Sequence, residues 1–257
     1  MTDSTMPTAG RGGAGRKRRD FAEADARAAA QVDADEETLR RRRSRLMTLP
    51  QAARAFVAHP SPWMIGSLLV GATVARLLVG DWRWTDALVP LLMVAAFPFV
   101  EWVIHVFVLH WRPRRLAGVE LDSLLARKHR AHHADPRDIP LVFIPWQVLA
   151  WTLPVYVVLA LLAFPRLGLG LTFLAFLGVL GMFYEWTHYL IHSDYKPRTR
   201  AYRAVWRNHR LHHYKNEHYW FTVTSSGTAD RLLGTYPDPA TVESSPTVKA
   251  LHERESA

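Results

Sequence analysis

Ten of the 13 histidines form four short clusters, and imidazole is a side chain that binds transition metals at neutral pH. The clusters repeat one pattern, a spaced pair followed by an HxxHH box. The pairs begin 83 residues apart, at 105 and 188, and the boxes 80 residues apart, at 129 and 209. This regularity predicts two equivalent half-sites that face each other. The histidines of the two repeats are His105, His110, His129, His132 and His133, then His188, His192, His209, His212 and His213.

Helix geometry explains most of this spacing. Positions i, i+3 and i+4 share one face of an α-helix, so each HxxHH box is expected to direct three imidazoles toward one place. The pair His188 and His192 directs two in the same way. His105 and His110 would lie roughly 140° apart on a regular helix. They converge only if the helix ends, bends or contains a π-bulge, and such bulges recur at functional sites.

The chemistry expected of these histidines is metal binding. The chain has no cysteine, which excludes disulfides, thiolate-bound metal sites and a cysteine nucleophile. Burying ten imidazoles together is costly unless each has a partner, and a metal supplies one. Ten ligands exceed the four of a structural zinc site and suit two ions with about five each. All-imidazole ligation fits Zn, Cu, Fe or Ni, and two adjacent redox metals indicate oxygen activation.

Nearby acids and the other histidines have weaker patterns. Glu101 is four residues before His105, and Glu185 is three before His188, so each is expected to accept the second N–H of a ligating histidine. Asp122 is a weaker candidate for the same role. The remaining histidines are His59, His218 and His252. They are expected to be ordinary surface or interfacial residues, and the role of His218 is left open.

Four long apolar runs separate these clusters, at 62–80, 87–111, 139–165 and 167–184. A bilayer core of about 30 Å needs roughly 20 apolar residues in a helix, and all four runs are near or above that length. The short links within each pair of runs predict two helical hairpins. The sequence therefore predicts an all-α membrane protein with four transmembrane helices.

The basic residues are distributed unevenly around these runs. The formal net charge is +9, and 29 of the 32 Lys and Arg residues fall in segments 1–60, 110–140 and 193–257. The positive-inside rule then places both termini, the middle loop and the histidine clusters on the cytoplasmic face. This topology, without a nucleic-acid fold signature, argues against nucleic acid as a partner. The basic cluster at 40–45 is either solvated or in contact with anionic lipids.

At the histidine clusters the sequence resembles the fatty acid hydroxylase branch of the integral-membrane fatty acid hydroxylase/sterol desaturase superfamily. That family carries HxxxxH, HxxHH, HxxxH and HxxHH boxes in the order found here. More specific words also match, and HHYKN is typical of the fatty acid 2-hydroxylase type. The resemblance covers about residues 50–238, and its words are HHADPRD (132–138), YEWTHYLIH (184–192), HHYKN (212–216), FTVTSS (221–226) and DRLLGT (230–235).

The resemblance implies four membrane helices under a cytosolic helical cap that holds a histidine-rich dimetal site. It implies two iron ions, with zinc possible in the isolated protein, and the use of O2 and two electrons to hydroxylate a fatty acyl chain of a lipid at C2. No cytochrome b5 domain is found in the sequence, so we expect a separate cytochrome b5-like or ferredoxin-like donor. The expected domains are a disordered basic tail (1–48), the membrane domain (49–238) and a disordered C-terminal tail (239–257).

This chain departs from the family at two places. Thr222 replaces a usual glycine, and residues 217–220 replace apolar or small residues. Both changes could reshape the substrate entrance.

Two alternatives stay open on sequence alone. The first keeps the chemistry but changes the substrate to a sterol, a carotenoid or a sphingoid base, or changes the outcome to desaturation. The second is a metal transporter or a bis-histidine haem electron carrier. Transport needs polar groups near the bilayer midplane, which runs three and four lack, and a bis-histidine haem leaves eight histidines unexplained.

Overall fold

The computed structural model describes residues 46–252. Within them, four helical segments are long and apolar enough to cross a membrane, which confirms the predicted spans. Large apolar side chains on these segments are exposed, for example Leu78 at 82% and Leu162 at 78%. Such surfaces are unfavourable in water and indicate an integral membrane protein. The segments are Pro60–Val79, Trp84–Leu109, Ile139–Ala163 and Leu167–His192.

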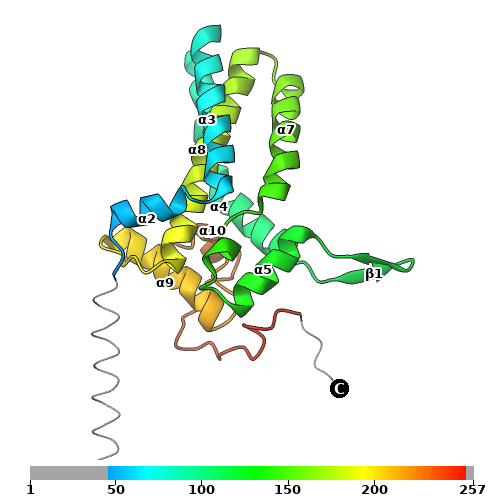
Figure 1. The fold of residues 1–257 in the computed structure, drawn as a ribbon, viewed down its shortest axis with the longest axis vertical. Helices are drawn as coiled ribbons and strands as arrows, with labels where there is room; N and C mark the ends of the chain where they lie inside the picture. The colour runs from blue at the N-terminus through cyan, green and yellow to red at the C-terminus, as the bar shows by residue number, and fades with distance from the viewer. Residues whose placement is uncertain (1–45, 253–257) are drawn as a thin grey trace, which may run out of the picture. The chain divides into compact units, whose positions relative to one another are not determined.

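The helix α8 (Leu167–His192) is the centre of the membrane bundle. It packs against α3 (Pro60–Val79), α7 (Trp146–Ala163) and α4 (Leu88–Ile104). Figure 1 shows α3 and α8 side by side, with α7 beside them. The contact with α3 is close at Gly178, where an added Cβ would lie 2.7 Å from Leu69 Cβ. A small residue at this point allows the two backbones to approach, as is common between membrane helices.

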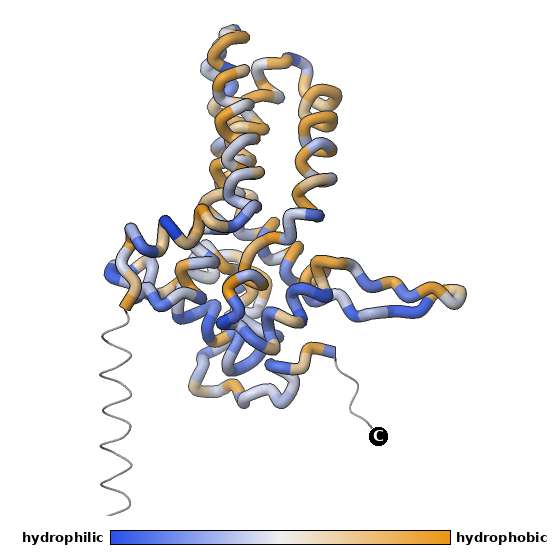
Figure 2. The backbone as a smooth tube through the Cα atoms, viewed as in Figure 1, coloured by the Kyte–Doolittle hydropathy of each residue, from blue (hydrophilic) through white to orange (hydrophobic). Residues whose placement is uncertain are grey.

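A polar cap lies at one end of the bundle. Figure 2 shows the change from apolar helices to a mainly hydrophilic cap. Two of its helices begin at hydroxyl residues that cap the first turn: Ser123 Oγ accepts from Ala126 N at 3.1 Å, and Thr199 Oγ1 accepts from Tyr202 N at 3.2 Å. These contacts fix where the two helices that carry the HxxHH boxes start. The cap helices are α2 (Leu49–Phe56), α5 (Leu124–Ala134), α6 (Ile139–Val142), α9 (Arg200–Tyr214) and α10 (Thr228–Leu232).

One short β-ribbon interrupts the otherwise helical architecture of the described residues. Strand β1 (Arg114–Leu116) pairs antiparallel with β2 (Val119–Leu121), and all six residues are exposed. The connecting residues Ala117 and Gly118 both have positive φ, at 49° and 81°. This is the backbone that two-residue hairpins require, and Gly118 adopts it readily. Ala117 adopts it against the usual preference of a residue with a Cβ, so no clear signal in the sequence predicts the ribbon.

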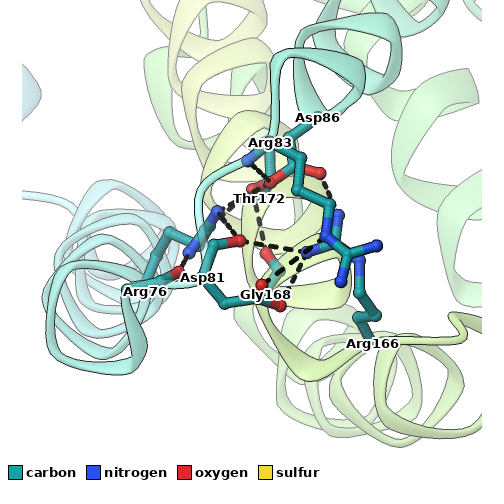
Figure 3. A network of polar contacts seen from close by, with 8 residues as sticks. Arg76, Asp81, Arg83, Asp86, Arg166, Gly168 and Thr172 are labelled. Atoms are coloured by element: carbon teal, nitrogen blue, oxygen red, sulfur yellow. Dashed lines mark hydrogen bonds and ion pairs between the residues drawn. The ribbon is translucent and has the colours of Figure 1, made fainter.

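An ion-pair network joins the two hairpins at the end of the bundle opposite the cap (Figure 3). Arg76 is buried in α3 and pairs with Asp86 at 2.8 Å, while its Nε donates to Thr172 Oγ1 at the start of α8 at 3.0 Å. Arg166 binds Asp81 at 2.7 Å and also contacts Asp86. The loop of the first hairpin is therefore tied to the beginning of α8.

The C-terminal segment differs from the expected disordered tail. Residues 239–252 lie against the cap, with Val248 and Leu251 buried and Ser245 N donating to Lys215 O at 2.7 Å. Two apolar anchors in a polar stretch were too few to reveal this packing from sequence. Residues 1–45 and 253–257, including the basic cluster at 40–45, lie outside the described residues.

The close contact at Gly178 generates a prediction. Gly178→Ala places a Cβ 2.7 Å from Leu69 Cβ and 2.9 Å from Leu69 Cα, so the helices must separate. Overpacking of this kind typically costs about 1–3 kcal/mol. We expect a lower midpoint of thermal unfolding in detergent. Gly71→Ala is the matched control, because its Cβ meets nothing within 4 Å and should be neutral or stabilising. Equal midpoints for the two variants would contradict the packing.

Candidate metal centre

The structure brings all ten predicted histidines together where the cap meets the membrane helices. They form two groups of five, and within each group one nitrogen from every histidine lies within 4.8 Å of the others. Eight of the ten side chains are buried. The first group is His105, His110, His129, His133 and His212, and the second group is His132, His188, His192, His209 and His213.

The two HxxHH boxes are shared between the groups. The outer histidines of each box stay with the pair from their own repeat, but the middle ones, His132 and His212, join the other group. The expectation that all three histidines of a box point toward the same position is therefore wrong. On a helix, i+3 and i+4 lie on opposite sides of i, roughly 100° apart, so each box spans the boundary between the groups. The two half-sites interlock rather than merely face each other.

The first histidine pair converges through a π-bulge. Residues His105–Leu109 form a π-helix, η2, at the end of α4. His110 N donates to His105 O at 3.0 Å, a bond across five residues that replaces the usual four. The extra residue brings the two imidazole centroids to 5.0 Å. Of the three expected alternatives, a helix end, a bend or a π-bulge, the structure therefore has the π-bulge.

Backbone carbonyls fix the tautomers of two facing histidines in the first group. His133 Nδ1 donates to Val248 O at 3.1 Å, and His212 Nδ1 donates to Tyr219 O at 2.8 Å. A carbonyl oxygen only accepts, so in the neutral rings both Nε2 atoms carry lone pairs. These two atoms face each other at 3.2 Å. Two ligand nitrogens about 2.1 Å from one ion, at nearly a right angle, would be about 3 Å apart, so the arrangement fits a metal cation.

Nitrogen atoms of the second group converge on His209. Its Nε2 lies 3.1 Å from His188 Nε2, 3.0 Å from His192 Nε2 and 3.0 Å from His213 Nε2. One nitrogen cannot form three hydrogen bonds of this kind, because it carries either one hydrogen or one lone pair. Both nitrogens of the buried His132 have no hydrogen-bond partner among the described residues. A cation is again the partner that this donor set fits.

Glu101 has a different role from the expected one. Its carboxylate accepts from Thr224 N at 3.1 Å and Thr224 Oγ1 at 2.6 Å, not from a histidine. His105 Nδ1 instead donates to Phe221 O at 2.5 Å, three residues before Thr224. The acid thus holds the loop whose carbonyl orients the ligand.

Glu185 has the same role in the second repeat. It accepts from Ile144 N at 3.1 Å, and His188 Nδ1 donates to Val142 O at 2.9 Å, two residues earlier. The expectation of direct histidine contact fails because the helix directs both acids toward neighbouring backbone amides. The duplicated pattern nevertheless extends to the acids, because each acts on its histidine through a backbone segment that it holds.

Two further residues support the site and were missed from sequence. Asp230, fully buried, accepts from Phe221 N at 2.9 Å and Thr222 N at 3.0 Å and so fixes the loop that serves His105. Its motif DRLLGT was the only signal. His252, expected to have no role, donates from Nε2 to His110 O at 2.9 Å. Asp122 pairs with Arg130 rather than with a histidine.

The electrostatics of the box histidines favour ligation. Burial lowers the pKa of His212 to about 4. Burial, followed by the charge of neighbouring histidines, lowers the pKa of three others well below the ordinary value of 6.5: His129, His133 and His213. Metal ligation requires neutral imidazole, so these rings are already in the form that binds metal at neutral pH.

An apolar four-helix bundle with two interlocked groups of buried histidines defines a class of integral-membrane proteins with a histidine-rich metal centre. Within that class, the sequence model described as fatty acid hydroxylase matches residues 90–235, more than half of the chain. The chain therefore belongs to the fatty acid hydroxylase family.

A curated relative is also similar in sequence. A dihydroceramide fatty acyl 2-hydroxylase from Arabidopsis thaliana is 28% identical over 153 residues, which cover 58% of this chain. The matched region spans 62% of that relative. No solved structure matches this chain significantly.

The lowered pKa values generate a prediction for the metal-free protein. The buried histidines stay neutral in the folded state but take up protons in the unfolded chain below about pH 6.5. The free energy of unfolding is therefore highest above that pH. It decreases as the pH falls toward 4, by about 1.4 kcal/mol per histidine and pH unit. We expect the midpoint of thermal unfolding to fall steadily below about pH 6.5.

The matched control is His218→Ala, which removes a histidine that is 65% exposed. It should leave the pH profile unchanged. A flat profile for the unmodified protein across this range would contradict buried, neutral imidazoles.

Proposed function

We propose that this protein is an O2-dependent di-iron monooxygenase that hydroxylates a fatty acyl chain of a lipid at C2. The observation that carries the proposal is the pair of five-histidine groups at the end of an apolar bundle. Family membership supports an oxidoreductase acting on acyl chains. The similarity to a dihydroceramide fatty acyl 2-hydroxylase supports the C2 position.

The ten histidines are proposed to bind two iron ions, one in each group, and zinc could occupy the same positions in isolated protein. When bound, iron would supply the activation of O2: one oxygen atom enters a C–H bond, and the other leaves as water with two electrons and two protons. A separate cytochrome b5-like or ferredoxin-like protein is the proposed electron donor. Five neutral ligands for each ion suit iron, because imidazole is among its preferred ligands.

The residues of the chain orient the ligands and exclude water. Carbonyls of Phe221 and Val142 hold His105 and His188 in one tautomer. The Phe221 ring lies 5.5 Å from the rings of His105 and His110, and Tyr184 lies 5.6 Å from His188. These aromatic rings place apolar surface beside both groups. The acyl chain is proposed to reach the site from the bilayer, along the apolar helices.

The charge distribution supports a cytoplasmic site. Positive residues concentrate in the cap segments, and the positive-inside rule places that face in the cytoplasm. Both termini would lie on the same face, where soluble electron donors are available.

Lipid profiling tests the proposed reaction. Cells that express the protein should accumulate 2-hydroxy acyl lipids, and cells expressing His132→Ala should not, because His132 belongs to the second group. Mass spectrometry of total lipids measures both. Unchanged acyl chains with altered sterols or carotenoids, altered sphingoid bases, or new double bonds would favour the alternative substrates or desaturation instead.

Metal content tests the interlocked groups. His129→Ala with His212→Ala removes two ligands of the first group and leaves the second complete, so about one ion should remain after treatment with a mild chelator. His129→Ala with His132→Ala removes one ligand from each group, so both ions should become removable.

Elemental analysis of purified protein distinguishes the two double variants. His218→Ala is the control and should keep two ions. The same metal loss in both double variants would contradict the crossover, and hydroxylation by protein free of iron would contradict the proposed function.

A further inference from the structure

The C-terminal residues Glu243–His252, termed the strap, contact the metal centre from the cap side. Figure 1 shows this part of the chain, near the red end of the colour scale, at the end of the cap farthest from the membrane helices. The strap lies beyond residue 235, where the family match ends. Val248 and Leu251 are its buried anchors.

The strap supports ligands of the first group at two points. Val248 O accepts from Nδ1 of His133 at 3.1 Å, which leaves Nε2 of that ring free to bind metal. His252 Nε2 donates to His110 O at 2.9 Å, while Arg112 Nε donates to His252 Nδ1 at 3.1 Å. Each contact orients a histidine or its backbone, and both histidines belong to the first group.

The loop after α9 holds the strap in place. Ser245 N donates to Lys215 O at 2.7 Å, and Asn216 Nδ2 donates to Glu243 O at 3.2 Å. This loop directly follows the second HxxHH box, whereas the strap orients a histidine of the first box. The strap therefore connects the two repeats outside the histidines themselves.

Glu217 is the strongest attachment between this loop and the strap. Its side chain is 1% exposed, and its Oε1 accepts from Ser245 Oγ at 2.9 Å and from Thr247 Oγ1 at 2.5 Å. Hydrogen bonds to a carboxylate are shorter and stronger than those between neutral groups. Thr247 immediately precedes Val248, so fixing its hydroxyl also restrains the peptide group that orients His133.

Glu217 is also one of the positions where this chain departs from the family pattern. A buried carboxylate is costly without donors, and here both hydroxyl donors come from the strap. Without the strap, this buried carboxylate would lose both hydroxyl donors. The departure has a specific structural use in this chain, the attachment of the strap.

We propose that Glu217 and the strap position the ligands of the first histidine group and thereby set the metal affinity of that group and not of the second. Glu217 is a positioning residue: it acts on His133 through Val248 and touches neither metal nor substrate. The inference rests on the metal centre of the proposed function. It predicts two metal positions that differ in their dependence on the C-terminal segment.

Titration of metal-free, full-length protein with Zn²⁺ alone tests this inference. The unmodified protein should bind two ions. Glu217→Ala should weaken one binding step at least tenfold and leave the other unchanged, because within the described residues the strap's hydrogen bonds to ligand histidines all go to the first group. Glu217→Gln should restore binding, since its amide oxygen still accepts from both hydroxyls.

Glu243→Ala is the matched control, because it removes an exposed carboxylate from the strap while the backbone carbonyl of residue 243 remains. It should bind both ions normally. If Glu217→Ala does not fold, the double variant Ser245→Ala with Thr247→Val removes the two donors and is read in the same way.

Two results would overturn the inference: unchanged binding of both ions, or equal weakening of both, which would mean that the strap only stabilises the cap. Failure of the unmodified protein to bind two ions would instead overturn the proposed metal centre, so the two failures are distinguishable.

Discussion

The repulsion between lone pairs of buried, neutral imidazoles is the constraint on which this structure depends. Carbonyl acceptors fix His133 and His212 as tautomers whose Nε2 atoms face each other at 3.2 Å. In the second group, three nitrogens crowd around His209 Nε2. In neutral rings no arrangement of hydrogens satisfies these contacts, whereas a cation in each group does. The cap, the helix ends and the loops all serve to hold this otherwise unfavourable arrangement.

The supports are alike in the two repeats but do not come from the same elements. Glu101 and Glu185 each hold a backbone segment whose carbonyl orients the nearest histidine. For Glu101 the segment lies after α9, and for Glu185 it lies before α7. The strap adds support to the first group alone, through Val248 and His252. Two chemically similar ligand sets are therefore held by different numbers of supporting hydrogen bonds.

The membrane bundle positions this centre from the opposite end. Arg76, Asp86 and Arg166 join the two hairpins far from the cap, and Gly178 allows close packing of α3 against α8. Fixing the far ends of the helices limits how their near ends, which carry His105 and His188, can move relative to each other. Removing charges from water is costly, and the attraction within an ion network offsets this cost only where the charges are paired, as they are here.

The sequence by itself determined the four spans and the clustering of ten histidines, because these follow from residue type and from the fixed period of a helix. It also required an irregularity between His105 and His110, but only the structure showed that this is a π-bulge and not a bend or a helix end. Only the tertiary structure decided which histidines share a group, since the exchange of His132 and His212 depends on how two helices face each other. The contacts of Glu101 and the folded strap were likewise beyond the sequence. Both depend on partners more than 100 residues away, Thr224 and His133, which no local pattern specifies.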